Sequence, residues 1–69
     1  MSAKLKGEFT ESEIEFFRLR CNFTADERAV FDLRVRGASL VAIALTLHMS
    51  ESTVQRRIRA IKRKIVRVS

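Results

Sequence analysis

The chain has 69 residues, a formal net charge of +6 and a composition that is 46% hydrophobic, with no proline and two glycines. A chain of this length holds one small domain, whose core supplies only about 3–5 kcal/mol of stability unless something reinforces it. This length and composition exclude a separate catalytic domain, a disordered tail and a turn-rich β-sandwich. They favour a single all-α domain without a sheet.

Cysteine usage and hydropathy indicate the compartment. Cys21 is the only cysteine, so it cannot form an intramolecular disulfide. The N-terminus lacks the apolar run of a signal peptide, and no segment approaches the roughly 20 apolar residues that a membrane span needs. We therefore expect a reducing, cytoplasmic setting, in which Cys21 acts as a small hydrophobe beside a helix end.

The chain begins with a short basic stretch over residues 1–8 that shows no periodicity. We interpret it as a flexible arm, in which Lys4 and Lys6 could touch phosphate or could simply be solvated. The helical domain is then expected to span residues 9–69.

A capping box predicts the first helix. Thr10 and Glu13 have the spacing at which each side chain satisfies an unpaired backbone N–H at a helix start. A helix over about 11–20 should follow, with one apolar face formed by Ile14, Phe17 and Cys21. Phe16 lies next to Phe17, and both cannot point inward from a helix with a single apolar face. Phe16 and Phe17 therefore mark this helix as a candidate contact surface for a second copy or another protein.

The same device introduces the second helix, in which Thr24 and Glu27 repeat the capping spacing. The helix should run over about 25–36 and stop at Gly37, because glycine takes the left-handed conformation of a helix end most easily. Its expected core contacts are Val30, Phe31 and Val35.

Ser39 is placed to cap a short third helix over about 40–47. Alternating apolar residues in this run would also fit a buried strand. However, its two alanines are poor strand residues, and helices on both sides leave a strand no partner. The chain should then turn through His48 and Met49 to Ser50.

The fourth helix, over about 51–67, is the most strongly specified. Apolar residues step by four and three along it and form a core-facing seam of Val54, Ile58, Ile61, Ile65 and Val68. Polar and basic residues fall on the opposite side, namely Ser52, Arg56, Arg59 and Arg63, with Gln55 and Lys62 on one flank. We therefore expect a helix that is buried on one side and cationic on the other.

Positive charge is concentrated at this end of the chain. Seven basic residues follow Gln55 with no carboxylate between them: Arg56, Arg57, Arg59, Lys62, Arg63, Lys64 and Arg67. Such a face can be merely solvated or can lie on an anionic membrane, but the seam lacks the aromatic anchors of a membrane helix. A polyanion, with nucleic acid foremost, is the expected partner.

Several of these features together resemble a known family. They are Phe23-Thr24 with Glu27, Leu33-Arg34-Val35-Arg36-Gly37, Ser39, Ile43-Ala44, Leu47 and, above all, Ser50-Glu51-Ser52-Thr53-Val54. Over residues 22–65 the chain resembles the DNA-binding domain of the LuxR and GerE family, and it is also similar to the fourth region of bacterial sigma factors. The resemblance implies a helix-turn-helix over 39–66 and a transcriptional regulator of bacterial or phage type that binds double-stranded DNA.

The resemblance also implies roles for the residues of the fourth helix. Its exposed residues after the Thr-Val pair would reach base edges in the major groove, and here these are Gln55, Arg56 and Arg59. Phosphate contacts are expected from the hydroxyls at the helix start and from cations farther along: Ser50, Ser52, Thr53, Arg57, Lys62, Arg63 and Lys64.

The chain departs from the family pattern at two places. His48 occupies the turn position usually filled by glycine, which is tolerable for histidine but carries some strain. The helix that follows the recognition helix in LuxR-type domains, and often forms their dimer interface, has no counterpart up to Ser69. A helix over 11–20 is present instead, and we expect it to cover the surface left bare.

Catalysis finds no support in the sequence. The single histidine and the single cysteine have no matched acid-base partners, and there is no glycine-rich phosphate loop. We predict no enzyme activity, metal, cofactor or small-molecule ligand. Two other functions stay open, a DNA-packaging protein similar to a small terminase subunit and a sigma-like module that docks on RNA polymerase.

Overall fold

The computed structural model describes residues 9–69, which form four helices and no strand. The helices are α1 (Glu11–Arg20), α2 (Ala25–Val35), α3 (Leu40–Leu47) and α4 (Glu51–Val68). The all-α prediction is confirmed. Two ends differ from it by one residue, since α2 stops at Val35 with Arg36 as its cap and α4 continues to Val68. The expected basic arm with Lys4 and Lys6 lies outside the described residues.

Each helix begins at the side chain expected to cap it. In α1 and α2 the capping boxes are complete, because the threonine hydroxyl accepts from the glutamate N–H and the glutamate carboxylate accepts from the threonine N–H. The hydroxyls of Ser39 and Ser50 accept the equivalent bonds at α3 and α4, from the N–H groups of Ala42 and Thr53. Caps of this kind contribute about 1 kcal/mol each.

Two residues with positive φ set the directions of the turns. Gly37, with φ of 97°, ends the α2 segment, and its N–H donates to the carbonyl of Arg34. His48 has φ of 57° and ψ of 45°, the left-handed conformation expected of it. The N–H of the next residue, Met49, donates to the carbonyl of Ala44 and so closes the C-terminal turn of α3. α4 begins two residues later.

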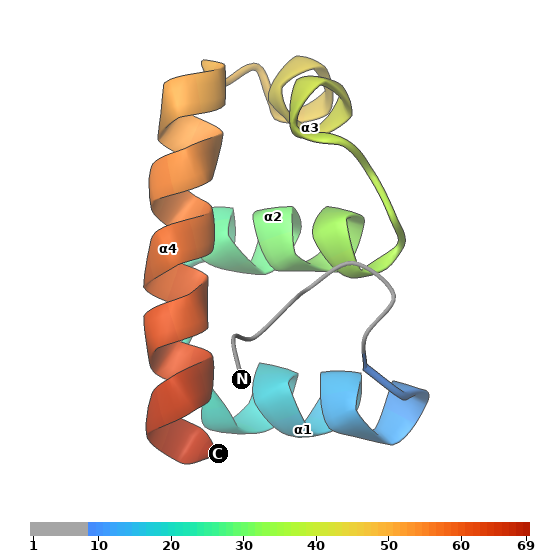
Figure 1. The fold of residues 1–69 in the computed structure, drawn as a ribbon, viewed down its shortest axis with the longest axis vertical. Helices are drawn as coiled ribbons and strands as arrows, with labels where there is room; N and C mark the ends of the chain where they lie inside the picture. Colours follow the sequence, from blue (N-terminus) through green and yellow to red (C-terminus); the bar gives the residue numbers. More distant parts are fainter. Residues whose placement is uncertain (1–8) are drawn as a thin grey trace.

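α4 is the helix against which the rest of the domain is built. It packs against α1, α2 and α3, all of which lie on one side of it (Figure 1). α3 lies beside the N-terminal end of α4, and α1 beside its C-terminal end (Figure 1). Within residues 9–69, no helix covers the other side of α4.

The core lies where the helices meet. Its buried members come from all four helices and the α1–α2 connection: Phe17, Cys21, Phe23, Val30, Phe31, Ile43, Ala44, Val54, Ile61 and Ile65. Four other expected core residues, Ile14, Val35, Ile58 and Val68, are only half-buried and pack against its edge. Phe16 and Phe17 diverge as expected, since Phe17 is buried and Phe16 is 42% exposed.

Candidate nucleic-acid interface

The open side of α4 carries the residues expected to read DNA. Val54, Ile61 and Ile65 point into the core, and this orientation leaves the opposite face of the helix to solvent. The exposed polar residues of this face include Ser52, Gln55, Arg56, Arg59, Lys62 and Arg63, and the apolar Val66 is exposed on the same side near the end of the helix. All three predicted base-reading residues are thus accessible on one side of one rigid helix.

Hydroxyl groups and a guanidinium gather at the first turn of α4. The Ser50 hydroxyl donates to Thr53 Oγ1 at 2.9 Å, and Nη2 of Arg56 donates to the same oxygen at 3.3 Å. This end also carries the positive pole of the helix dipole, which attracts anions. Glu51, exposed in the same turn, is the one carboxylate of α4 and opposes that attraction in part.

A groove runs beside this face where α4 meets the end of α2 and the start of α3. Its lining combines apolar walls with three cations and no carboxylate: Arg34, Leu40, Gln55, Ile58, Arg59 and Lys62. Arg34 is anchored there because its Nη1 donates to the carbonyl of Ala38 at 2.9 Å. The sequence did not single out Arg34 for this surface, since its proximity to Arg59 and Lys62 depends on how α2 crosses α4.

Two of the cations expected to contact phosphate face α2 instead of solvent. Nζ of Lys64 donates to Glu27 Oε1 at 2.6 Å and to the carbonyl of Asn22 at 2.9 Å. Arg57 forms a longer and more exposed ion pair with Asp26, at 3.6 Å. The ammonium of Lys64 is therefore already bonded inside the protein, where it supports the contact between α2 and α4, and its phosphate contact stays a prediction. The side chain of Arg57 is also directed toward α2, but its ion pair holds it less firmly than the two hydrogen bonds hold Lys64.

The buried carboxylate of Glu27 is stabilised by these partners. Burial alone raises the pKa of Glu27, but the hydrogen bond from Lys64 and the one from the Thr24 N–H outweigh it, so the pKa lies below its ordinary value of 4.5. A carboxyl with a lowered pKa in the folded state stabilises the fold above its unfolded pKa, and this contribution is lost as the pH falls through the folded value. The Glu27–Lys64 contribution should therefore begin to decline as the pH falls to about 4.5, and it should be lost once the pH is below the lower pKa of the folded state.

Replacing Glu27 by glutamine tests this pair. Glutamine preserves the capping box but removes the charge that Lys64 requires, so Glu27→Gln should lower the free energy of unfolding by about 1.5–3 kcal/mol at pH 7. The matched control is Glu11→Gln, which changes an exposed carboxylate in the first turn of α1 and should cost less than about 0.5 kcal/mol. Urea titrations at pH 7 and pH 3 measure both, and equal losses for the two variants would contradict the structural role of the pair.

The single cysteine lies in the core. Cys21 is 1% exposed, and burial raises the pKa of its thiol, although the nearby Lys64 charge acts in the opposite direction. Among residues 9–69, no three histidine, cysteine or acidic side chains are grouped as a metal site. Within the same described range, no helix has the length and apolar character that crossing a membrane requires.

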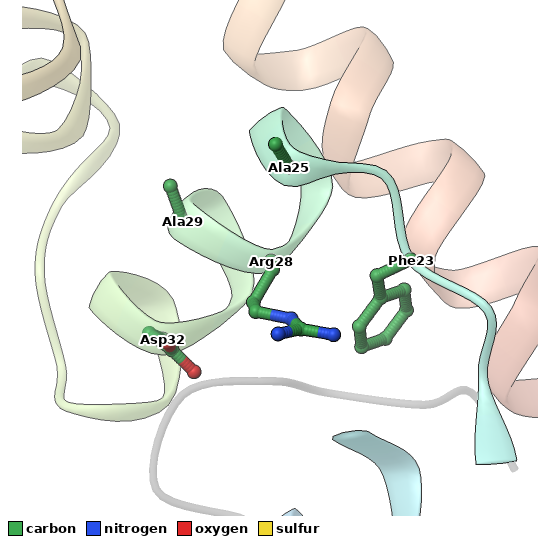
Figure 2. Close-up of a pocket in the computed structure, with 5 residues that line it drawn as sticks. All are labelled: Phe23, Ala25, Arg28, Ala29 and Asp32. Atoms are coloured by element: carbon green, nitrogen blue, oxygen red, sulfur yellow. The ribbon is translucent and has the colours of Figure 1, made fainter. Parts of the chain in front are cut away.

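A hollow lies on the surface of α2. It is lined by Phe23, Ala25, Arg28, Ala29 and Asp32, and Figure 2 shows the Arg28 side chain extending between Asp32 and the Phe23 ring. Oδ1 of Asp32 already accepts from Nε of Arg18 at 2.9 Å, and the same oxygen lies 2.9 Å from Nη2 of Arg18. A carboxylate paired in this way is part of the α1–α2 contact, and the lining supplies no nucleophile beside it.

No protein-family model matches the chain, and no curated protein or solved structure is significantly similar to it. The resemblance to the LuxR and GerE family and to the sigma-factor region rests on the residues quoted above.

Proposed function

We propose that this protein is a sequence-specific regulator of transcription, of bacterial or phage type, that binds double-stranded DNA. In this proposal α3, the turn at His48 and α4 act as a helix-turn-helix, and α4 enters the major groove. The observation that carries it is the two-sided character of α4, whose seam is buried while the opposite face presents Gln55 and several cations to solvent.

The base-reading part of the proposal concerns the first half of α4. The guanidinium groups of Arg56 and Arg59 can each bond O6 and N7 of guanine, and the amide of Gln55 can bond N6 and N7 of adenine. All three residues are exposed and lie within the first three turns of the helix. A major groove about 12 Å wide accepts a helix of this diameter, so the three side chains would reach base edges together.

Phosphate contacts would come from both sides of this reading face. Ser50, Ser52 and Thr53 lie at the positive end of the helix dipole, and Lys62 and Arg63 follow the base-reading residues by one turn. Arg34 extends this set across the groove to α2. Lys64 is left out because its ammonium is bonded to Glu27 and Asn22.

Lys62→Ala tests the phosphate-contacting role. Loss of one phosphate contact should weaken binding to all duplexes alike and reduce the slope of log K against log salt by about one unit. Fluorescence anisotropy of a labelled duplex at several salt concentrations measures that slope. The charge-matched control is Arg28→Ala, on α2, which should leave the slope close to that of the unmodified protein. A slope unchanged by Lys62→Ala would remove this residue from the interface.

One observation favours a second candidate, a sigma-like module that docks on RNA polymerase. Val41 and Leu45 lie one turn apart on α3 and are 51% and 73% exposed, so α3 offers apolar area to a protein partner. A complex with RNA polymerase that forms without DNA and is lost on changing Leu45 to serine would support this alternative.

A further inference from the structure

Three residues form a continuous stripe along the exposed side of α1. Glu13, Phe16 and Arg20 are three and four positions apart, the spacing of neighbours on one helix face. The guanidinium carbon of Arg20 lies 5.6 Å from the centroid of the Phe16 ring. In chain order the stripe therefore presents an acid, an aromatic ring and a base.

The surface around this stripe is mainly apolar. A hollow beside it joins α1 to the end of α4 and is lined by Ser12, Glu13, Phe16, Phe17, Val68 and Ser69. Leu19, one turn from Phe16, is 80% exposed. The aromatic ring of Phe16 thus lies in an accessible patch that spans two helices.

We propose that this stripe is the interface of a homodimer in which the α1 helices of two copies lie antiparallel. The charge order of the stripe favours a second copy as the occupant. In an antiparallel pair related by a two-fold axis, Phe16 of each copy lies near the axis, and Glu13 of each copy lies opposite Arg20 of the other, so both charge pairs form at once. A parallel pair would place like charges together.

Local geometry leaves both charged groups available for this contact. Glu13 and Arg20 are two turns apart, about 10 Å along the helix axis, which leaves room for both aromatic rings between them. Oε1 of Glu13 accepts from the Thr10 N–H, and the second oxygen of the same carboxylate can accept from a guanidinium. Arg20 contacts the ring by its guanidinium, a placement that leaves N–H groups free to donate to the other copy.

The dimer does not depend on DNA, and it leaves the DNA face uncovered. α1 lies beside the C-terminal end of α4, whereas Gln55, Arg56 and Arg59 lie toward its N-terminal end (Figure 1). The same two-fold axis relates the two α4 helices, so a dimer that binds DNA through both of them would prefer a palindromic target if the proposed function also holds.

Sedimentation equilibrium of the full chain without DNA tests the interface. The unmodified protein should be dimeric, and Arg20→Glu, which sets two acids against each other on each side, should raise the dimer dissociation constant by at least about tenfold. Phe16→Ser should do the same by removing the ring. Arg28→Glu makes the identical charge change on α2 and should leave the dimer intact, while circular dichroism of each variant confirms that it is folded.

A mixing experiment tests whether two variants that do not pair alone can pair with each other. Glu13→Lys alone should also fail to pair, but an equimolar mixture with Arg20→Glu should restore a dimer, because the lysine-bearing stripe then faces the glutamate-bearing one. A monomeric unmodified protein at several hundred micromolar, or an Arg20→Glu variant that dimerises like the unmodified chain, would overturn the proposal. Either result would leave DNA binding by a monomer untouched, so the two proposals fail separately.

Discussion

Phe31→Ala is expected to unfold the domain. Phe31 has no exposed surface, and its ring packs against that of Phe23 with the centroids 5.0 Å apart. Truncation of a buried phenylalanine costs about 3–5 kcal/mol, as lost burial and as a cavity. A domain of this size has about the same total stability, so the variant should be largely unfolded at 25 °C.

Far-UV circular dichroism during a thermal scan measures this effect. The unmodified protein should show one cooperative transition, whereas Phe31→Ala should show weak helical signal and no transition. Leu45→Ala is the matched control, because this leucine is 73% exposed on α3 and its removal should change stability by less than about 0.5 kcal/mol. A Phe31→Ala variant that melts close to the unmodified protein would mean that the core is not arranged as described.

Arg56→Ala combined with Arg59→Ala should remove most of the discrimination between DNA sequences. Each arginine that bonds a guanine through two hydrogen bonds contributes about 1–3 kcal/mol of base preference, so the double change should weaken binding to a preferred site by about 10²–10⁴-fold. Loss of two charges also weakens binding to random duplex, though much less than binding to the preferred site. Neither side chain enters the core, so the fold should persist.

Competition binding separates the two effects. A labelled preferred duplex is displaced by unlabelled preferred or random duplex, and the ratio of the two affinities is the specificity. The ratio should fall towards one for the double variant and stay unchanged for Lys62→Ala, which removes a cation from the same helix. Equal losses on preferred and random DNA for both variants would show that Arg56 and Arg59 act only through charge.

Local signals explain why the helix boundaries could be predicted from sequence. Thr10 with Glu13, and Thr24 with Glu27, fix helix starts through bonds between residues three apart, so no knowledge of the tertiary structure is needed. The left-handed turn at His48 was expected for a different reason, because the family that the chain resembles usually has glycine at this turn position. The seam of α4 likewise follows from periodicity alone.

Contacts between helices account for what the sequence could not give. The bond between Lys64 and Glu27 joins residues far apart in the chain. Periodicity separates Lys64 from the open face that carries Arg63, but it does not show which helix lies beside Lys64. Its position relative to α2 emerges only when α2 and α4 pack. Arg34 likewise lies in one groove with Arg59 and Lys62 only because α2 packs against α4. Charge patterning therefore predicted a cationic helix but did not show that two of its cations, Lys64 and Arg57, pair with carboxylates of α2.

Selection of bound sequences from a random duplex pool tests the central claim most directly. With the unmodified protein, we expect an enriched consensus that contains guanine at positions lost in a parallel selection with Arg56→Ala. Arrangement of that consensus as two inverted half-sites would further agree with pairing through α1. A pool that is retained in a salt-dependent manner but shows no enriched sequence would contradict sequence-specific reading by α4, and would leave a DNA-packaging role in its place.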